Sequence, residues 1–277
     1  MIDAHQHLWR IGENDCTWPT PELEKIYRNF DVSDLQPLVM AAGVTGTVLV
    51  QSQMSDKDTD SLLALASQHD LIKAVVGWVD LASPDAVARI RELTKHPKMR
   101  GLRPMLQGLA DDCWILRPQI EAAIVEMKAQ ALSFDALIFP RHLPVVQEFA
   151  MRHEDLAIVI DHGAKPNIAS GGFDEWAEHI ARIAQLPNVS CKLSGLVTES
   201  AVHQGITELR IYAEHIFREF GASRIMWGSD WPVVNLASNP EFASYQDWIN
   251  LARQLLTLSP AEEQAVFVQN AKNFYRF

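Results

Sequence analysis

Short apolar runs alternate with segments of helical spacing along the whole chain. Runs such as Thr47-Val48-Leu49-Val50 and Ala157-Ile158-Val159-Ile160 are nearly continuously apolar, which is typical of parallel strands covered on both faces. Eight strands are predicted in this way, and they are Ile2–Leu8, Thr45–Ser52, Lys73–Leu81, Met99–Leu106, Ser133–Phe139, Leu156–Gly163, Val189–Gly195 and Arg224–Asp230. Their alternation with helical segments favours a parallel sheet connected by crossover helices.

The helical segments have recognisable ends. Asp31 or Ser33 is expected to cap a helix that Gly43 ends, and Ser83-Pro84 is expected to start another, with proline in the first turn. Further predicted helices are Arg117–Ala131, Leu143–His153, Phe173–Leu186, Gly205–Phe220, Glu241–Leu256 and one that follows Ser259-Pro260.

Eight such units predict a closed (β/α)₈ TIM barrel that forms a single domain over residues 1–277. The alternative is an open, doubly wound sheet, but no GxGxxG follows the first strand to support it. The long stretch between Gly12 and Asn29, which contains Trp18-Pro19, falls on the catalytic face of a barrel. It either covers the site or packs on the barrel rim.

Composition narrows the class of protein. The chain has 277 residues, of which 48% are apolar and 21% charged, as in a globular enzyme. A net charge of −11 argues against binding to nucleic acid or to anionic membranes. No apolar run reaches the roughly 18 residues of a membrane span, and the three cysteines form no CxxC pair. We therefore expect a cytoplasmic protein with reduced thiols, and the sequence leaves open whether it forms a homo-oligomer.

The sharpest local signal for chemistry is His5-Gln6-His7 in the first strand. Alternate residues of a strand point to the same side, so the two imidazoles share one face. Two neutral imidazoles held together suit a divalent metal such as zinc or manganese. An HxH sequence also occurs by chance in many chains, so other residues must support this interpretation.

Two residues at the ends of later strands give that support. Asp230 ends the eighth strand, which lies beside the first strand in a closed barrel, so its carboxylate can bind a metal or accept a proton from water. His162 ends the sixth strand and can reach the barrel axis. Taken singly, Asp230 can equally be a capping residue, and a lone histidine is usually structural.

These residues resemble the amidohydrolase superfamily, in particular its amidohydrolase-related branch that contains sugar lactonases. The resemblance covers nearly the whole chain. Its motifs are Asp3-Ala4-His5-Gln6-His7-Leu8-Trp9, Gly46–Gln51, Val76–Leu81, Gly101-Leu102-Arg103, Leu132–Asp135, Asp161–Pro166, Lys192–Leu196 and Gly228-Ser229-Asp230-Trp231-Pro232. The set is similar to fuconolactonases, rhamnonolactonases, sulfomuconolactonases and pyrone-dicarboxylate lactonases.

The resemblance implies hydrolysis of a small-molecule lactone. It assigns Asp230 as the base that deprotonates water and then protonates the departing alkoxide, with His162 beside it. The implied metal ligands are His5, His7, His162 and Asp230. Arg103 stands where most members have a bridging Lys or Glu, and no histidine precedes His142 on the fifth strand, so a two-metal site is not expected. One zinc or manganese ion is compatible with the set, and members that act without metal leave metal-independent catalysis open.

Several residues are candidates for contact with the substrate. Arg103 and Lys165 can bind an anionic or carbonyl oxygen, and Trp18 and Trp231 can form an apolar wall against a ring. Asp80 and Asp135 can accept hydrogen bonds from hydroxyl groups or instead cap a turn. The alternatives are a rim salt bridge for Arg103 and buried core packing for the aromatic residues.

A lactone of a sugar acid, such as L-fuconolactone or L-rhamnonolactone, is the favoured substrate, because a dicarboxylate or sulfonate would need two or more convergent cations. The alternatives are a lactonase for muconolactone or pyrone-dicarboxylate intermediates, a metal-dependent decarboxylase and a barrel that binds without catalysis. The presence of both first-strand histidines and Asp230 argues against the last of these.

Overall fold

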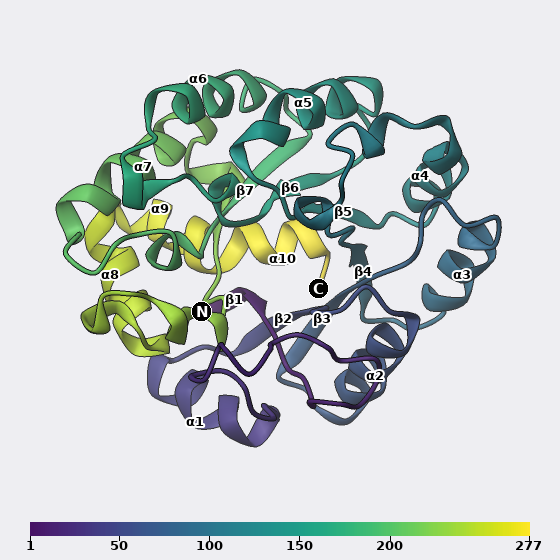
Figure 1. Cartoon of the computed structure of the whole chain (residues 1–277), viewed down its shortest axis with the longest axis horizontal. Helices are drawn as coiled ribbons and strands as arrows, with labels where there is room; N and C mark the ends of the chain where they lie inside the picture. Colours follow the sequence, from purple (N-terminus) through teal and green to yellow (C-terminus); the bar gives the residue numbers. More distant parts are fainter.

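The computed structural model describes all 277 residues as a parallel barrel. Its eight strands pair in the order of the sequence, and their bounds are β1 Ile2–Gln6, β2 Gly46–Val50, β3 Ile72–Gly77, β4 Met99–Leu102, β5 Ser133–Ala136, β6 Ile158–Ile160, β7 Val189–Leu193 and β8 Ile225–Trp227. A parallel bridge between Gln6 and Trp231 joins β1 to the segment after β8. The predicted (β/α)₈ barrel is confirmed, and Figure 1 shows its ring of outer helices.

The outer layer consists of the helices that connect the strands. They are α1 Val32–Ala42, α2 Asp56–Gln68, α3 Ala86–Leu93, α4 Glu121–Ala129, α5 Leu143–Arg152, α6 Asp174–Ile183, α7 Ile206–Phe220 and α8 Tyr245–Leu255. The chain ends with α9 Pro260–Gln264, the π-helical turn η11 Ala265–Gln269 and α10 Asn270–Tyr275. No helix combines the length and apolar character needed to cross a membrane.

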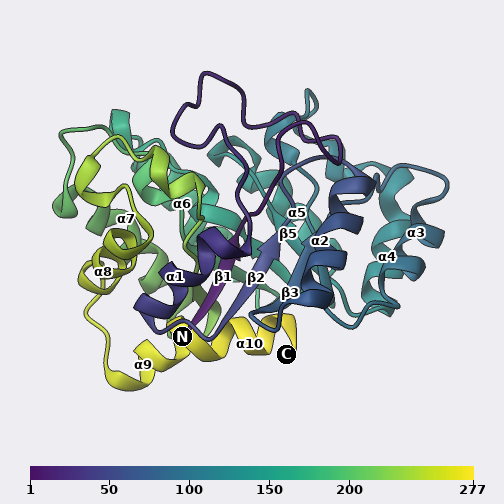
Figure 2. The same ribbon diagram turned by 90° about the horizontal axis from the view of Figure 1, so that it is seen from below.

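Helix α10 closes the amino-terminal end of the barrel. Figure 2 shows it at the bottom of the molecule, opposite the long loop that follows β1. Ala271 and Tyr275 belong to a small buried cluster with inward-facing strand residues such as Val48 and Val50. A larger cluster of 70 buried residues fills the layer between the strands and the helices. Because the lower interior is filled by side chains, only the opposite, carboxyl-terminal end is left for a site.

The predicted ends of two helices agree with the structure. Asp31 caps α1 in a reciprocal capping box with Asp34, and Gly43 ends the helix in the left-handed conformation with φ 69°. Ser259 caps α9 in the same way, with Pro260 in the first turn. In both cases short-range hydrogen bonding determines the boundary, and the sequence contains that information.

Four helices differ from the sequence analysis in whether they were predicted or in where they begin. Helices α4 and α8 begin at Glu121 and Tyr245, four residues after the predicted starts at Arg117 and Glu241. Helix α2 was not predicted, because its first six residues, from Asp56 to Ser61, are all polar and hide the apolar face. Helix α3 begins at Ala86 and not at Ser83-Pro84. The Ser83 side chain accepts a hydrogen bond from the Asp85 amide, so residues 83–85 form a turn before the helix.

The Asp3 carboxylate fastens the two ends of the sheet together. Its Oδ1 accepts hydrogen bonds from the His5 amide at 3.1 Å and the Ser229 amide at 2.8 Å. Its Oδ2 accepts one from the Tyr245 hydroxyl at 3.0 Å. Asp3 is completely buried, so each donor would be left without a partner if the carboxylate were removed.

We therefore expect Asp3→Ala to lower the free energy of unfolding by about 3 kcal/mol, since it leaves three buried donors unpaired. Urea unfolding followed by circular dichroism measures this change. Asp155→Ala is the control, because its exposed ion pair with Lys128 contributes little. Equal stability of the two variants would contradict a role of Asp3 in holding β1 to β8.

Candidate active site

The site is formed where β1 and β8 meet at the carboxyl-terminal end of the barrel. The Asp230 amide donates to the His5 carbonyl at 2.8 Å, and the His7 amide donates to the Trp231 carbonyl at 2.7 Å. These two bonds place the predicted HxH pair beside the predicted carboxylate, although 225 positions of sequence separate His5 from Asp230. His5 is fully buried, and His7 and Asp230 are almost so.

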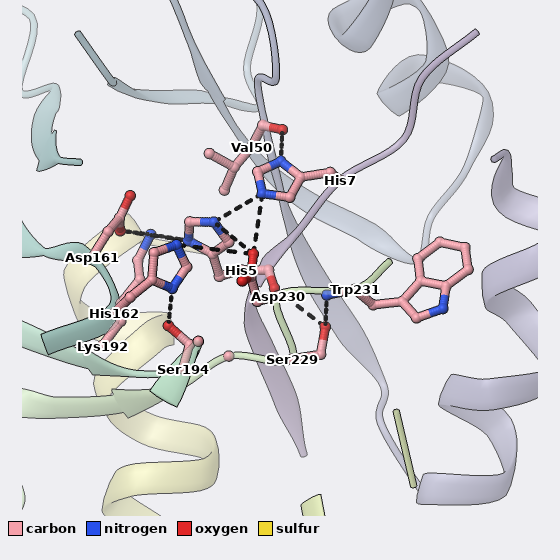
Figure 3. Close-up of polar contacts among 12 residues, drawn as sticks. His5, His7, Val50, Asp161, His162, Lys192, Ser194, Ser229, Asp230 and Trp231 are labelled. Atoms are coloured by element: carbon pink, nitrogen blue, oxygen red, sulfur yellow. Dashed lines mark hydrogen bonds and ion pairs between the residues drawn. The ribbon is translucent and has the colours of Figure 1, made fainter. Parts of the chain in front are cut away.

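Three imidazoles converge on one oxygen atom (Figure 3). Asp230 Oδ1 lies 3.4 Å from His7 Nε2, 3.8 Å from His5 Nε2 and 3.9 Å from His162 Nε2. The Nε2 atoms of His5 and His7 are themselves 3.1 Å apart. The structure therefore brings together all four residues that the sequence analysis proposed as the metal and catalytic set.

Each imidazole is oriented by a partner at its other nitrogen. The Val50 carbonyl, which can only accept, lies 2.8 Å from His7 Nδ1, so Nδ1 carries the proton and Nε2 presents a lone pair. Ser194 Oγ lies 2.8 Å from His162 Nδ1. His5 Nδ1 faces Lys192 Nζ at 3.0 Å and Asp161 Oδ1 at 3.4 Å.

Two glycines make room for the imidazoles. A β-carbon at Gly195 would lie 2.7 Å from His162 Nδ1, and one at Gly228 would lie 2.7 Å from the β-carbon of His5. The backbone adds a further constraint, because His162 has φ 55° and Asp230 has φ 54°. These left-handed conformations aim the two side chains at the barrel axis, and such strain is typical of functional sites.

Burial determines the charge states of these groups. Loss of hydration lowers the pKa of His5, His7 and His162, the last to about 4, so that the imidazoles are neutral near pH 7. Burial by itself would raise the pKa of Asp230, but the neighbouring His162 and His7 outweigh it and hold the pKa below its ordinary value. The site thus presents neutral nitrogen donors around an ionised carboxylate.

A buried ionic network lies in the barrel interior, on the α10 side of the imidazoles, and contacts His5. Lys192 Nζ lies 2.7 Å from Asp135 Oδ2 and 2.9 Å from Asp161 Oδ1. Asp161 also pairs with Arg103 at 3.3 Å, and the Tyr275 hydroxyl of α10 donates to Asp135 at 2.6 Å. The sequence analysis did not identify Lys192 or Asp161 as site residues. The available signal was the lysine at the fourth position of the short strand β7, Val189–Leu193.

A pocket of about 470 Å³ opens above the imidazoles. Of the predicted substrate-binding residues, Arg103, Trp18 and Lys165 line it together with the catalytic candidates. Among the lining residues that the sequence analysis missed are Gln53 and Glu199. Both follow a strand by a few residues, but their positions depend on loop conformations that periodicity does not reveal.

The other three predicted contacts lie outside this pocket. Asp80 is exposed and its carboxylate accepts from the Ala82 amide, which is the turn-capping alternative. Asp135 is fully buried in the ion pair with Lys192. Trp231 is buried and packs edge to face against Phe30, with ring centroids 5.1 Å apart. These side chains are already used for local structure, so we assign none of them a contact with substrate.

The donor set fits a divalent metal ion. His5, His7 and Asp230 each offer one ligand atom, and these three atoms lie within 4.8 Å of one another. Two neutral imidazoles and one carboxylate are a frequent ligand set for catalytic zinc, which retains an open position. The hydrogen bond from His7 Nδ1 to a carbonyl is the kind of outer contact that orients a zinc-bound histidine.

Comparison with known proteins agrees with this geometry. A family model described as amidohydrolase matches residues 2–277. The chain is 49% identical over 277 residues to an L-fucono-1,5-lactonase of Burkholderia ambifaria, covering 99% of this chain and 95% of that protein. It is 34% identical to an L-fucono-1,5-lactonase of Burkholderia multivorans, with the same coverage.

A crystal structure of an amidohydrolase from Burkholderia multivorans with bound zinc superposes with a TM-score of 0.93 at 34% identity, covering 100% of this chain and 99% of that one. A pyrone-dicarboxylic acid hydrolase from Acinetobacter baumannii, described as probable and solved with citric acid, shares the fold with a TM-score of 0.82 at 18% identity, covering 100% of this chain and 99% of that one. The resemblance derived from the motifs is therefore confirmed, and the expected divalent metal agrees with the zinc found in a relative.

We expect His7→Ala to weaken zinc binding by about 100-fold or more, because it removes one of three protein ligands. Competition with a chromophoric chelator measures the affinity. Lys165→Ala, a pocket variant outside the donor set, should retain wild-type affinity. Equal zinc affinity in His7→Ala and the wild-type protein would contradict the assignment of His7 as a ligand.

Proposed function

The chain belongs to the amidohydrolase family, and we propose that it is a lactonase that opens the cyclic ester of a sugar acid, with L-fucono-1,5-lactone as its substrate and L-rhamnonolactone as the next candidate. The observation that carries the proposal is the 49% identity with an L-fucono-1,5-lactonase over the whole chain. The convergence of three imidazoles on Asp230 at the base of a pocket supports it independently.

In the proposed reaction Asp230 acts as general base and then as general acid. Its ionised carboxylate accepts a proton from water as the water oxygen attacks the ester carbonyl carbon. The tetrahedral intermediate then expels the ring oxygen, and Asp230 returns the proton to it. One water is consumed, and the product is the open hydroxy acid.

The surrounding residues bind the substrate and stabilise the charge that develops on the carbonyl oxygen. Arg103 is nearly fully buried and lines the pocket, and its terminal nitrogens contact the Gln51 carbonyl and Asp161. A fixed guanidinium at a pocket that excludes water stabilises an oxyanion more strongly than one exposed to water. His5, His7 and Asp230, with His162 beside them, would hold a zinc ion, which would supply Lewis-acid polarisation of the ester carbonyl.

Charge in the pocket supports a neutral lactone over a dicarboxylate. The cations that line it are Arg103, which is already paired with Asp161, and Lys165. Asp230 and Glu199 supply two carboxylates to the same pocket. A dianion would meet as many negative as positive groups, whereas a polyhydroxy lactone can donate hydrogen bonds to Glu199 without repulsion.

Asp230→Asn is expected to lower kcat by about 100- to 10,000-fold, the usual contribution of general acid–base catalysis. Asparagine tolerates the positive φ of this position, so the fold should be retained. A pH-indicator assay with L-fucono-1,5-lactone, corrected for spontaneous hydrolysis, measures the loss. Turnover within a few-fold of wild type, with the variant folded by circular dichroism, would contradict the role of Asp230.

Glu199→Gln is expected to raise KM for the hydroxylated lactone by about tenfold, since a hydrogen bond to a charged acceptor becomes a neutral one. An unhydroxylated lactone of the same ring size should be affected little. Glu175→Gln provides the matched control, because this exposed residue borders only the neighbouring cavity. Equal changes in KM for both lactones would show that Glu199 does not accept hydrogen bonds from the hydroxyl groups.

A further inference from the structure

The loop after β1 reaches over the mouth of the catalytic pocket. Figure 2 shows this segment rising at the end of the barrel opposite α10. Thr17 and Trp18 of the loop line the pocket. The indole of Trp18 packs edge to face on Trp9, with ring centroids 5.3 Å apart, and remains half-buried. The position of this ring depends on how the loop backbone is held.

The side-chain amide of Gln53, which follows β2, holds that backbone. Its Oε1 accepts hydrogen bonds from the Thr17 amide at 3.1 Å and the Trp18 amide at 3.3 Å. Its Nε2 donates to the Trp18 carbonyl at 2.7 Å and to Ser52 Oγ at 3.0 Å. A primary amide has two acceptor positions and two donor hydrogens, so all four are occupied.

The saturation of its hydrogen bonds limits what the Gln53 side chain can do in the pocket. The side chain is only 5% exposed, and no donor or acceptor is left for a substrate. Its own backbone is fixed in turn, because the Ser52 and Gln53 amides both donate to Asp58 Oδ2 at 3.1 Å and 3.4 Å. A continuous chain of hydrogen bonds thus runs from the first turn of α2 to Trp18.

A second attachment of the loop differs in character. Asp15 pairs with Lys57 at 2.8 Å and accepts from Ser55 Oγ at 2.8 Å. The Asp15 and Lys57 side chains are 51% and 71% exposed, so solvent screens this ion pair. Cys16 Sγ adds a weak contact to the Trp18 carbonyl. The buried amide of Gln53 is therefore the principal attachment at the pocket.

We propose that Gln53 is a positioning residue that fixes Trp18 as the wall against which the lactone ring binds. The substrate is that of the proposed function, on which this inference rests. Gln53 acts through the loop backbone and makes no contact with the reacting atoms. Its loss affects substrate binding more than the chemical step, because Asp230 and the histidines are held by β1, β6 and β8.

Gln53→Met tests the proposal, because methionine has similar length and volume but cannot form these hydrogen bonds. We expect KM to rise about tenfold while kcat stays within about threefold, the effect of losing ordered contacts on one side of the ring. In the Trp18→Ala background the same substitution should change KM by less than about twofold, since the ring that Gln53 positions is absent. Independent, multiplicative effects of the two substitutions would overturn the proposal.

Hydrogen exchange of the loop gives a readout that does not need activity. In Gln53→Met, the amides of residues 12–29 should exchange about tenfold faster than in wild type. Gln53→Glu keeps the acceptor and loses the donors, so its increase should be smaller. Lys57→Ala is the control, with exchange at Thr17 and Trp18 unchanged. Wild-type protein that turns over no sugar lactone would contradict the proposed function, whereas unchanged exchange in Gln53→Met would overturn the role of Gln53 whatever the activity.

Discussion

The pairing of β1 with the segment after β8 is the interaction on which the site depends. The two backbone hydrogen bonds that join His5 to Asp230 and His7 to Trp231 bring the proposed metal ligands and the proposed catalytic carboxylate together. The buried Asp3 carboxylate reinforces them. Without this closure the sheet would have two open edges, and the catalytic residues would lie at opposite ends of it. Closing the barrel and assembling the site are therefore the same event.

The fold could be predicted from the sequence because its signals are local. Continuous apolar runs locate the eight strands, and side-chain caps such as Asp31 and Ser259 locate helix ends. Helix α2 was missed because its first turns are polar. One of these polar residues, Asp58, is buried and accepts hydrogen bonds from the Ser52 and Gln53 amides, so it occupies a position where an amphipathic helix would carry an apolar residue. A residue used for loop geometry weakens the amphipathic pattern on which such predictions depend.

The site could be predicted only in part. His5 lies in β1, and His7, His162 and Asp230 follow the ends of β1, β6 and β8 by one to three residues. A closed barrel brings these strand ends together, so topology places the four residues near one another. The roles of Asp135, Lys192 and Gln53 depend on contacts between distant segments. Asp135 was expected at the substrate, but it faces a buried lysine from β7 and the hydroxyl of Tyr275. No pattern along the chain states which buried charges will be partners, because that depends on packing in three dimensions.

The two glycines beside the imidazoles, Gly195 and Gly228, make the site sensitive to mutation at their own codons. Every single-base change in a glycine codon that replaces the residue introduces at least one β-carbon. At Gly195 and Gly228 that atom would lie 2.7 Å from His162 and from His5. Each missense mutation at these codons therefore displaces His162 or His5 without replacing either histidine. A substitution at either glycine is therefore expected to disturb the site although neither glycine takes part in the reaction.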